Sequence, residues 1–330
     1  MQEHPFAPYV RILGKGPNLS RSLTLGETRR AVAMILDGEV EPVQLGAFLC
    51  LMRVKTETPE EVAGFALAIR DSLVIPPDMP AVDIDWPSYA GKSRQLPLYL
   101  LAALLLSQNG LRVAMHGAAG HTAGRLYSAE ALSLLGITTA ASLEEAALQL
   151  QERNFTFLPM DVLHPRLQAI LDLKQLLGLR SPLHTVVRNL NPLDAKISLM
   201  SVFHPNYRKV HRDAATLMGM TELACFKGEG GEVERRPEKP CLVEGLRGGE
   251  VFEEEWAPTR PAGPARDLDM DARRLAALWR EDLRDAYAEA TIAATAAIAL
   301  RQLGRAASIA EAETLATRLW DERQRDALKT

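Results

Sequence analysis

The chain has 330 residues, of which 47% are hydrophobic and 24% are charged, so it can bury a sizeable core and has the composition of an ordinary globular protein. Its formal net charge of −4 gives no overall attraction for a polyanion, although Lys and Arg outnumber Asp and Glu within residues 91–213 and permit a local basic face. No apolar run reaches the roughly 18 residues of a membrane-spanning helix, no signal peptide is visible at the N-terminus, and the three cysteines have no metal or redox spacing, so we expect a cytoplasmic protein.

The first 76 residues predict a compact helical region. Thr24 begins a capping-box pattern, and the helix that follows it ends near Gly38. Residues 44–54 are apolar on most sides, so we expect a buried helix with Cys50 in its core. Thr58, followed by Pro59, starts the next helix. Helices this apolar need a further packing partner, either the rest of the chain or a second copy of it.

Residues 82–125 predict one β-loop-α-β unit. The run Val82–Trp86 and the run Leu111–Met115 indicate strands, and Leu98–Ser107 between them indicates a helix. A loop of small residues follows each strand. Ligands bind at that end of the strands in open α/β sheets, so we expect a ligand site there.

Strands and helices alternate through the remainder of the chain, which argues for an α/β sheet. Strands are expected at residues 155–158, 196–203 and 223–226, and helices at 128–135, after Ser142, and at 165–180, 205–217, 268–283, 287–303 and 308–328. Residues 227–239 read as a polar glycine-rich loop, which a short β-rich excursion and a proline-rich turn at 257–264 follow.

The order of these segments resembles the anthranilate phosphoribosyltransferase family, which has the glycosyltransferase family 3 and nucleoside phosphorylase class II fold. The motif LDGEVEPVQLGAFLCLMRVKTETPEEVAGFALAI at residues 36–69 is similar to the helical domain of that family. The motif AAIALRQLGRAASIAEAETLA at residues 296–316 is similar to its C-terminal helix pair. The resemblance implies an all-helical domain at residues 1–76, which residues 165–185 complete, and a larger α/β domain at 77–330. It also implies a central mixed, mostly parallel sheet flanked by helices, and a homodimer formed through the N-terminal helical domain.

Proteins of that family transfer a phosphoribosyl group from phosphoribosyl pyrophosphate to an aromatic amine, such as anthranilate in tryptophan biosynthesis. The reaction requires a glycine-rich loop whose backbone N–H groups hold the pyrophosphate, because side chains there would prevent close approach. It also requires acidic ligands for Mg²⁺, which neutralises the leaving pyrophosphate.

This sequence departs from the family at each of those motifs. Residues 86–90, WPSYA, stand where the family has Gly-Thr-Gly-Gly-Asp, and residues 96–99, LPLY, stand at its Asn-x-Ser-Thr run. Lys174 matches the arginine that orients anthranilate. The Asp-Glu metal pair matches Val233 and Glu234, so Glu234 alone could hold a metal. The remnant of the family substrate site is Ser88, Gly91, His116, Gly117 and His184.

The divergent YbiB-like branch of the family has this pattern of retained fold and altered motifs. Resemblance to that branch implies a homodimer that binds DNA or RNA in basic grooves, without a cofactor and without regard to sequence. Arg208 and Arg212 are four residues apart and would share one helix face. The candidate phosphate contacts are Lys92, Arg94, Arg166, Lys174, Arg180, Arg208, Lys209 and Arg212.

Two enzymatic alternatives stay open. The chain could still transfer a phosphoribosyl group from phosphoribosyl pyrophosphate with Mg²⁺, or it could use another donor or acceptor, with Lys92 and Arg94 replacing the loop amides as phosphate ligands. His116 and Glu234 also have plain structural explanations, because a lone histidine before a glycine is often buried and a lone carboxylate in a charged loop is often solvated.

Overall fold

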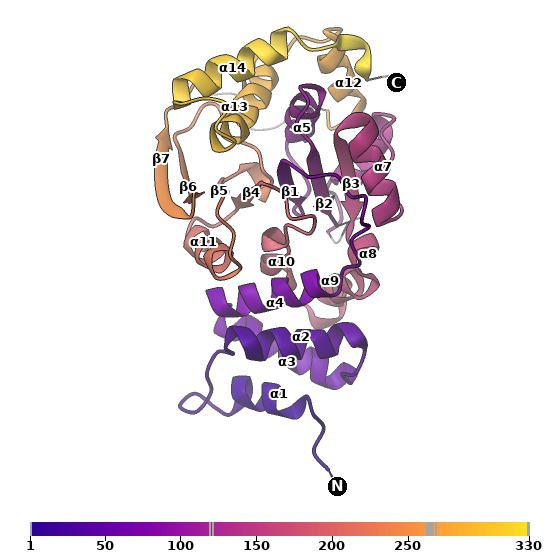
Figure 1. Cartoon of the computed structure of the whole chain (residues 1–330), viewed down its shortest axis with the longest axis vertical. Coiled ribbons are helices and arrows are strands. Elements are labelled where there is room, and N and C mark those ends of the chain that lie inside the picture. Colours follow the sequence, from indigo (N-terminus) through magenta and orange to yellow (C-terminus); the bar gives the residue numbers. More distant parts are fainter. Residues whose placement is uncertain (1, 119, 121, 262–266, 268, 329–330) are drawn as a thin grey trace.

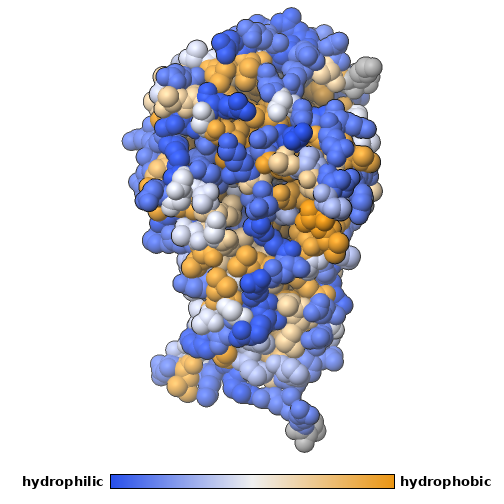
Figure 2. Space-filling view, viewed as in Figure 1, coloured by the Kyte–Doolittle hydropathy of each residue, from blue (hydrophilic) through white to orange (hydrophobic). Residues whose placement is uncertain are grey.

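The computed structural model describes residues 2–118, 120, 122–261, 267 and 269–328. The molecule is elongated, with the N-terminal helices at one end and the C-terminal helices at the other (Figure 1). Its face in Figure 2 is mainly hydrophilic, and the hydrophobic residues on it gather in separate patches. Among the described residues, no helix is both long and apolar enough to cross a membrane.

The N-terminal region is helical, as the sequence predicts. Its helices are α1 (Ala7–Gly14), α2 (Leu25–Asp37), α3 (Pro42–Lys55) and α4 (Pro59–Asp71). Complete capping boxes start α2 and α4, because Thr24 and Thr58 each exchange hydrogen bonds with a glutamate three residues later. Gly38 closes α2 with a φ of 80°, a left-handed conformation that glycine adopts without strain.

A seven-stranded sheet forms the centre of the α/β body, in the order β3-β2-β1-β4-β5-β6-β7. The first five strands in the chain run parallel to one another, β6 is antiparallel to β5, and β7 is antiparallel to β6. The predicted mixed, mostly parallel sheet is therefore confirmed. The strands are β1 (Ile84–Ser88), β2 (Val113–Gly117), β3 (Phe155–Pro159), β4 (Ile197–Val202), β5 (Leu223–Lys227), β6 (Cys241–Arg247) and β7 (Glu250–Trp256).

Helices cover both faces of this sheet (Figure 1). The helices after the N-terminal region are α5 (Tyr99–Gln108), α6 (Ser128–Leu134), α7 (Leu143–Arg153), α8 (Met160–Leu163), α9 (Pro165–Leu177), α10 (Leu183–Val186), α11 (Tyr207–Leu217), α12 (Arg273–Arg280), α13 (Ala286–Gln302) and α14 (Ile309–Asp321). Helix α13 packs against α5 on one side of the sheet, and α10 and α11 pack against α4 on the other. The helical region thus lies directly beneath the sheet.

The two faces of the sheet differ in polarity because successive residues of a strand point to opposite sides. Ile84 and Trp86 enter the hydrophobic core beneath α5 and α13. The core on the other face is continuous with the core of α1–α4. Buried polar side chains also lie along the strands, among them Asp85, His116 and Ser198. The boundary at residue 76 stays a prediction.

Three expectations about the elements need correction. Cys50 is only partly buried, because none of the described residues covers one face of α3. Helix α12 starts at Arg273, after Asp271 accepts a hydrogen bond from the Arg273 N–H (3.0 Å). Residue 268 and part of the proline-rich turn lie outside the described residues. Helix α14 ends at Asp321, where Arg323 turns back and donates to the carbonyl of Trp279 (2.8 Å).

Candidate functional site

A cleft lies beside the loops that follow β1, β4 and β5. It consists of a cavity of about 700 Å³ and an adjoining cavity of about 270 Å³. Arg125, Phe203 and Gly230 line both. The cleft is therefore at the carboxyl ends of parallel strands, the edge at which α/β sheets bind ligands and at which the sequence predicts a site.

Cationic side chains dominate the lining of this cleft. The acidic residues along it are Glu229 and Glu255. Such an excess of one sign in a concave surface attracts anions. The cations are Lys92, Arg94, Arg125, Arg180, Arg188, Arg208, Lys227, Arg236 and Lys239.

Part of this positive charge is neutralised within the protein. Lys92 pairs with Glu234 at 2.5 Å, Arg208 pairs with Glu244, and Arg236 pairs with Glu229 and Glu238. In the described part of the chain, no carboxylate pairs with the exposed side chains of Arg94, Lys227 and Lys239. These three remain available to a ligand.

A second group of positive charges gathers at the smaller cavity, which Arg125, Arg180 and Arg188 line and beside which Lys174 lies. We call Arg125, Lys174, Arg180 and Arg188 the cation cluster. Partial burial lowers the pKa of Lys174, and the charges of Arg180 and Arg125 lower it further. The pKa of Arg180 is lowered by burial first and then by the charge of Arg125. Mutual repulsion of this kind is relieved when an anion binds between the cations.

The loop after β1 is closed by a carboxylate of the protein itself. The N–H groups of Ala90 and Gly91 both donate to Oε1 of Glu232, each at 2.7 Å. Glu232 is fully buried, and burial raises its pKa. Backbone N–H groups that point toward one position form an anion-binding site, and here the carboxylate of Glu232 occupies that position.

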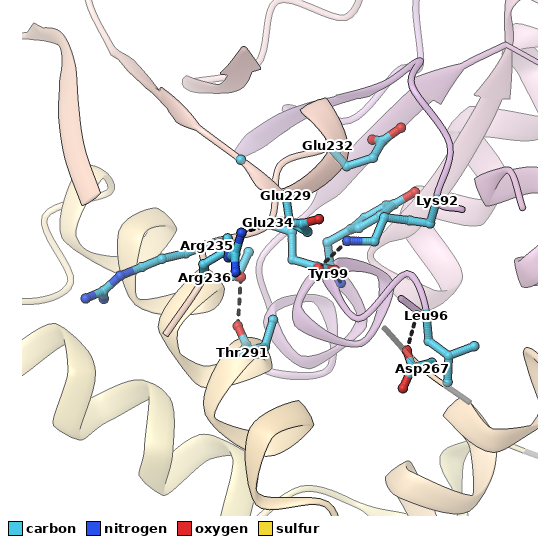
Figure 3. Close-up of polar contacts among 12 residues, drawn as sticks. Lys92, Leu96, Tyr99, Glu229, Glu232, Glu234, Arg235, Arg236, Asp267 and Thr291 are labelled. Carbon is cyan, nitrogen blue, oxygen red and sulfur yellow. Dashed lines mark hydrogen bonds and ion pairs between the residues drawn. The ribbon is translucent and has the colours of Figure 1, made fainter. Parts of the chain in front are cut away.

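A second carboxylate occupies the N-terminus of α5 (Figure 3). Glu234 accepts a hydrogen bond from the Tyr99 N–H at 3.0 Å and from the Lys92 ammonium at 2.5 Å. Burial raises the pKa of Glu234, and the charge of Lys92 opposes this rise. The ion pair and the helix N-terminus both favour the ionised form.

These contacts do not fit the metal site of the family. Mg²⁺ requires oxygen ligands that are free to coordinate it, whereas Glu232 and Glu234 are already held by internal donors. Val233, at the position of the missing aspartate, is buried and apolar. Within the described residues, no group of three or more His, Cys, Asp and Glu side chains is arranged to hold a metal ion.

His116 belongs to a buried polar network beneath the cleft. Its Nδ1 lies 2.6 Å from the Tyr89 hydroxyl. Its Nε2 lies 3.0 Å from Asp85 Oδ1, but these two atoms are not aligned for a hydrogen bond. Asp85 also accepts a hydrogen bond from the Ser198 hydroxyl at 2.7 Å. The network ties β1, β2 and β4 together, so the geometry agrees with the structural explanation of His116.

The other predicted remnant residues divide between the lining and the core. Gly91 and His184 line the cleft. Ser88 is buried and lies 2.6 Å from the Ser128 hydroxyl, so it does not face a ligand. Gly117 ends β2, where a side chain would collide with the Ser88 carbonyl.

The predicted phosphate contacts do not form one surface. Lys92, Arg94, Arg180 and Arg208 line the cleft, and Lys174 lies beside Arg180. Lys92 is only 2% exposed, so of the two candidate phosphate contacts in the loop after β1, only Arg94 is exposed to a ligand. The described cavities of the cleft do not include Arg166, which lies against Gly38, or Lys209 and Arg212, which both pair with Asp213.

Several residues that line the cleft are not among the candidates that the sequence suggests. Phe203 directly follows β4, and Lys227 is the last residue of β5. The rule that ligands bind at the carboxyl ends of parallel strands could have found both. Arg125, Arg188 and Lys239 lie in loops or short turns, and no local pattern marks them.

Two family models match the chain. The helical bundle domain of a glycosyl transferase family matches residues 7–73, and the a/b domain of that family matches residues 95–322. YbiB, an uncharacterized protein of Escherichia coli (strain K12), is 30% identical over 235 residues, which cover 70% of this chain and 72% of that protein. An anthranilate phosphoribosyltransferase of Methylocella silvestris is 29% identical over 312 residues, which cover 91% of this chain and 88% of that protein.

Solved structures share the fold. Anthranilate phosphoribosyltransferase (TrpD) from Thermus thermophilus superposes with a TM-score of 0.79 at 22% identity, covering 96% of this chain and 94% of that chain. Anthranilate phosphoribosyltransferase from Saccharomyces cerevisiae, in complex with PRPP and Mg, superposes with a TM-score of 0.76 at 15% identity, covering 96% and 93%. At these identities the likeness shows the fold alone.

Proposed function

The chain belongs to the glycosyl transferase family that joins a helical bundle domain to an a/b domain, and from this premise we propose that its cleft binds phosphate groups through cationic side chains. The observation that carries the proposal is the cation cluster, in which the charges of Arg125, Lys174 and Arg180 repel one another, together with three exposed cations of the adjoining cavity. Among the described residues, no carboxylate pairs with these three, Arg94, Lys227 and Lys239. Loop amides and a metal ion, on which the family relies, have no part in this binding mode.

A nucleic-acid strand is the ligand that we assign to this cleft. Its phosphates repeat along a chain, and cations follow one another through two adjoining cavities. Lys and Arg contacts to phosphates give affinity that depends on salt and is largely independent of sequence. Neither DNA nor RNA is favoured by the residues of the cleft.

The test is a fluorescence-anisotropy titration of a short labelled oligonucleotide at several salt concentrations. We expect the logarithm of affinity to fall linearly with the logarithm of salt concentration, by about one unit per neutralised phosphate. Arg180→Glu and Lys227→Glu each remove one contact and lower this slope by about 1.

Matched controls are available in the same chain. Arg166 and Lys209 are exposed but lie outside the described cavities of the cleft, so Arg166→Glu and Lys209→Glu leave the slope unchanged. A flat salt response of the wild-type protein, or equal losses in the cleft and control variants, contradicts nucleic-acid binding in this cleft.

A second candidate is phosphoribosyl transfer, and the comparisons favour it over nucleic-acid binding. Relatives that match 91% of this chain are anthranilate phosphoribosyltransferases, and one solved neighbour holds PRPP and Mg. Under this candidate the cleft holds phosphoribosyl pyrophosphate, and an aromatic amine such as anthranilate, or another acceptor, displaces pyrophosphate from the ribose. Arg94, Lys227 and Lys239 would bind the leaving pyrophosphate in place of loop amides.

Calorimetry with phosphoribosyl pyrophosphate, with and without Mg²⁺, separates the two candidates. The transferase candidate predicts heat of binding and, once an aromatic amine is added, release of pyrophosphate. No heat at millimolar ligand excludes it. Heat that does not change with Mg²⁺ agrees with the internal pairing of Glu232 and Glu234.

A further inference from the structure

Phe203 is an exposed aromatic residue inside a strongly charged cleft. It directly follows β4 and is 59% exposed. It lines both cavities of the cleft and a third, smaller cavity beside Tyr207. Leaving an aromatic ring in water forgoes the free energy that its burial would contribute. A ring at the junction of three cavities is thus in a position to contact a ligand in any of them.

The surroundings of Phe203 leave space beside the ring. His204 meets it in a T-shaped pair, with ring centroids 4.9 Å apart and an angle of 80° between the planes. Gly230 and Gly231 line the smaller cavity with Phe203, and they present no side chains to it. A Cβ added at Gly231 would lie 3.7 Å from the Phe203 Cβ. Because Phe203 is largely exposed and lines both cavities, a flat group can approach it from the cleft.

We propose that Phe203 is a stacking platform for an unpaired nucleobase, and that the neighbouring Arg125, Arg180 and Arg188 hold the phosphates next to that base. The inference rests on the proposed nucleic-acid binding and specifies its substrate as a single strand. Every nucleobase has a π face, so stacking on an aromatic side chain tolerates any sequence. A base inside a duplex has both faces covered by its neighbours and cannot stack on Phe203 without leaving the helix.

Two probes distinguish stacking from charge attraction. A single-stranded oligothymidylate carries phosphates and bases, whereas inorganic polyphosphate carries phosphates alone. We expect Phe203→Ala to weaken oligothymidylate binding by about tenfold or more and to leave polyphosphate binding unchanged. Phe203→Trp restores oligothymidylate binding, because the larger ring stacks at least as well. The four native tryptophans are mostly or fully buried, so the emission of Trp at position 203 reports base stacking directly.

The possible outcomes separate the inference from the proposed function. If Phe203→Ala binds both probes as tightly as the wild-type protein, or loses both equally, Phe203 is not a stacking platform. If Arg180→Glu still weakens the binding of both probes in that case, the protein binds polyanions through the cleft and the proposed function is supported. If the wild-type protein binds neither probe, the proposed function fails and the stacking site fails with it. Equal urea midpoints of the wild-type and Phe203→Ala proteins confirm that both are folded.

Discussion

At the scale of single residues, Glu232 decides what the loop after β1 can bind. Glu232→Ala frees the N–H groups of Ala90 and Gly91, whereas Glu232→Gln removes the same charge but keeps an oxygen that accepts from both. We therefore expect Glu232→Ala to bind inorganic pyrophosphate about tenfold or more tightly than Glu232→Gln, because hydrogen bonds to a charged group contribute about 1.5–3 kcal/mol each.

Calorimetry without added metal measures this difference. Both variants lose the carboxylate charge, so the electrostatic potential of the cleft becomes more positive by the same amount in each. This effect therefore cancels when the two affinities are compared. Identical affinities of the two variants would falsify the assignment of the loop amides as an anion site.

His211 makes the stability of the protein depend on pH. It is buried, its Nδ1 contacts the Asn189 Oδ1, and burial, helped by the charge of Arg188, lowers its pKa to about 3. The unfolded residue has a pKa of about 6.5. The unfolded state therefore binds the additional proton between these values. The contribution of His211 to stability is complete above about pH 6.5 and is lost as the pH falls toward 3.

The expected loss is about 1.4 kcal/mol per pH unit, or about 2 kcal/mol at pH 5. Urea unfolding of the wild-type protein and of His211→Gln at pH 7 and pH 5 isolates this contribution, since glutamine does not titrate. The free energy of unfolding of the wild-type protein falls further than that of the variant. Parallel pH profiles would contradict the assignment to His211.

The residue types in the sequence predicted that the site is positively charged, but not which of its cations are neutralised by carboxylates of the protein. Lys92 follows an altered phosphate loop and looks like an exposed cation in the sequence. Its neutralisation depends on Glu234, which is 142 residues away in the chain. Arg208 is neutralised in the same way by Glu244 on β6. No local pattern reveals such pairs, because they form only when the sheet brings distant loops together.

At the scale of elements, Gly117 fixes how closely the ends of β1 and β2 approach. A Cβ at this position would lie 2.1 Å from the Ser88 carbonyl oxygen, far inside van der Waals contact. Gly117→Ala must therefore push the two strand ends apart. We expect it to lower the free energy of unfolding by about 1–3 kcal/mol, the usual cost of overpacking. Urea unfolding measures this loss, and Gly124→Ala serves as a control.

Gly124 has no atom within 4 Å of an added Cβ, so the control carries only the strain of its φ of 73°. An unchanged midpoint for Gly117→Ala would mean that the strand ends separate without cost. The retained glycine would then need another explanation, such as the substrate contact of the parent family.

Most elements were predictable because their signals are local. Capping residues set the starts of α2 and α4, and apolar runs marked the strands to within a few residues. The prediction failed where a distant contact ends an element. Arg323 stops α14 by donating to carbonyls of α12, and nothing in residues 308–328 announces this contact.

At the scale of the whole molecule, we propose that the exposed face of α3 forms a homodimer interface. Val43 and Val54 are each 79% exposed, and Ala47 and Cys50 lie between them at helical spacing. A twofold axis would bury this apolar face against the same face of a second copy. The family resemblance implies a homodimer formed through the helical domain, and the exposed face of α3 is a surface through which two copies could associate.

Analytical ultracentrifugation tests this interface. We expect the wild-type protein to sediment as a dimer and the double variant Val43→Asp, Val54→Asp to sediment as a monomer. Val251→Asp is the control, because Val251 is also exposed, at 57%, but lies on β7 at the edge of the sheet. If the double variant remains a dimer, or if the control dissociates, the exposed face of α3 is not the interface.

The sequence predicts where the cleft lies, but it does not predict which residues line it. The β-loop-α-β unit pointed to the correct edge of the sheet, since the rule about strand ends depends only on topology. The cations that line the cleft come from segments far apart in the chain: the loops after β1, β2 and β5, the end of β5 itself, the turns on either side of α10, and α11. Which of them meet is decided by the strand order β3-β2-β1-β4-β5, which the sequence analysis did not predict.

The carboxylates of Glu232 and Glu234, which come from the segment after β5, also constrain how the loop after β1 can change in evolution. Glu232 provides an anion for the N–H groups of the loop, and Glu234 provides one for the start of α5. The loop is therefore complete without a ligand. Replacing either glutamate singly leaves buried donors without a partner, and restoring glycines alone leaves the anion in place. Opening the loop amides to an external anion therefore requires several substitutions together, and the single steps toward it give less stable proteins.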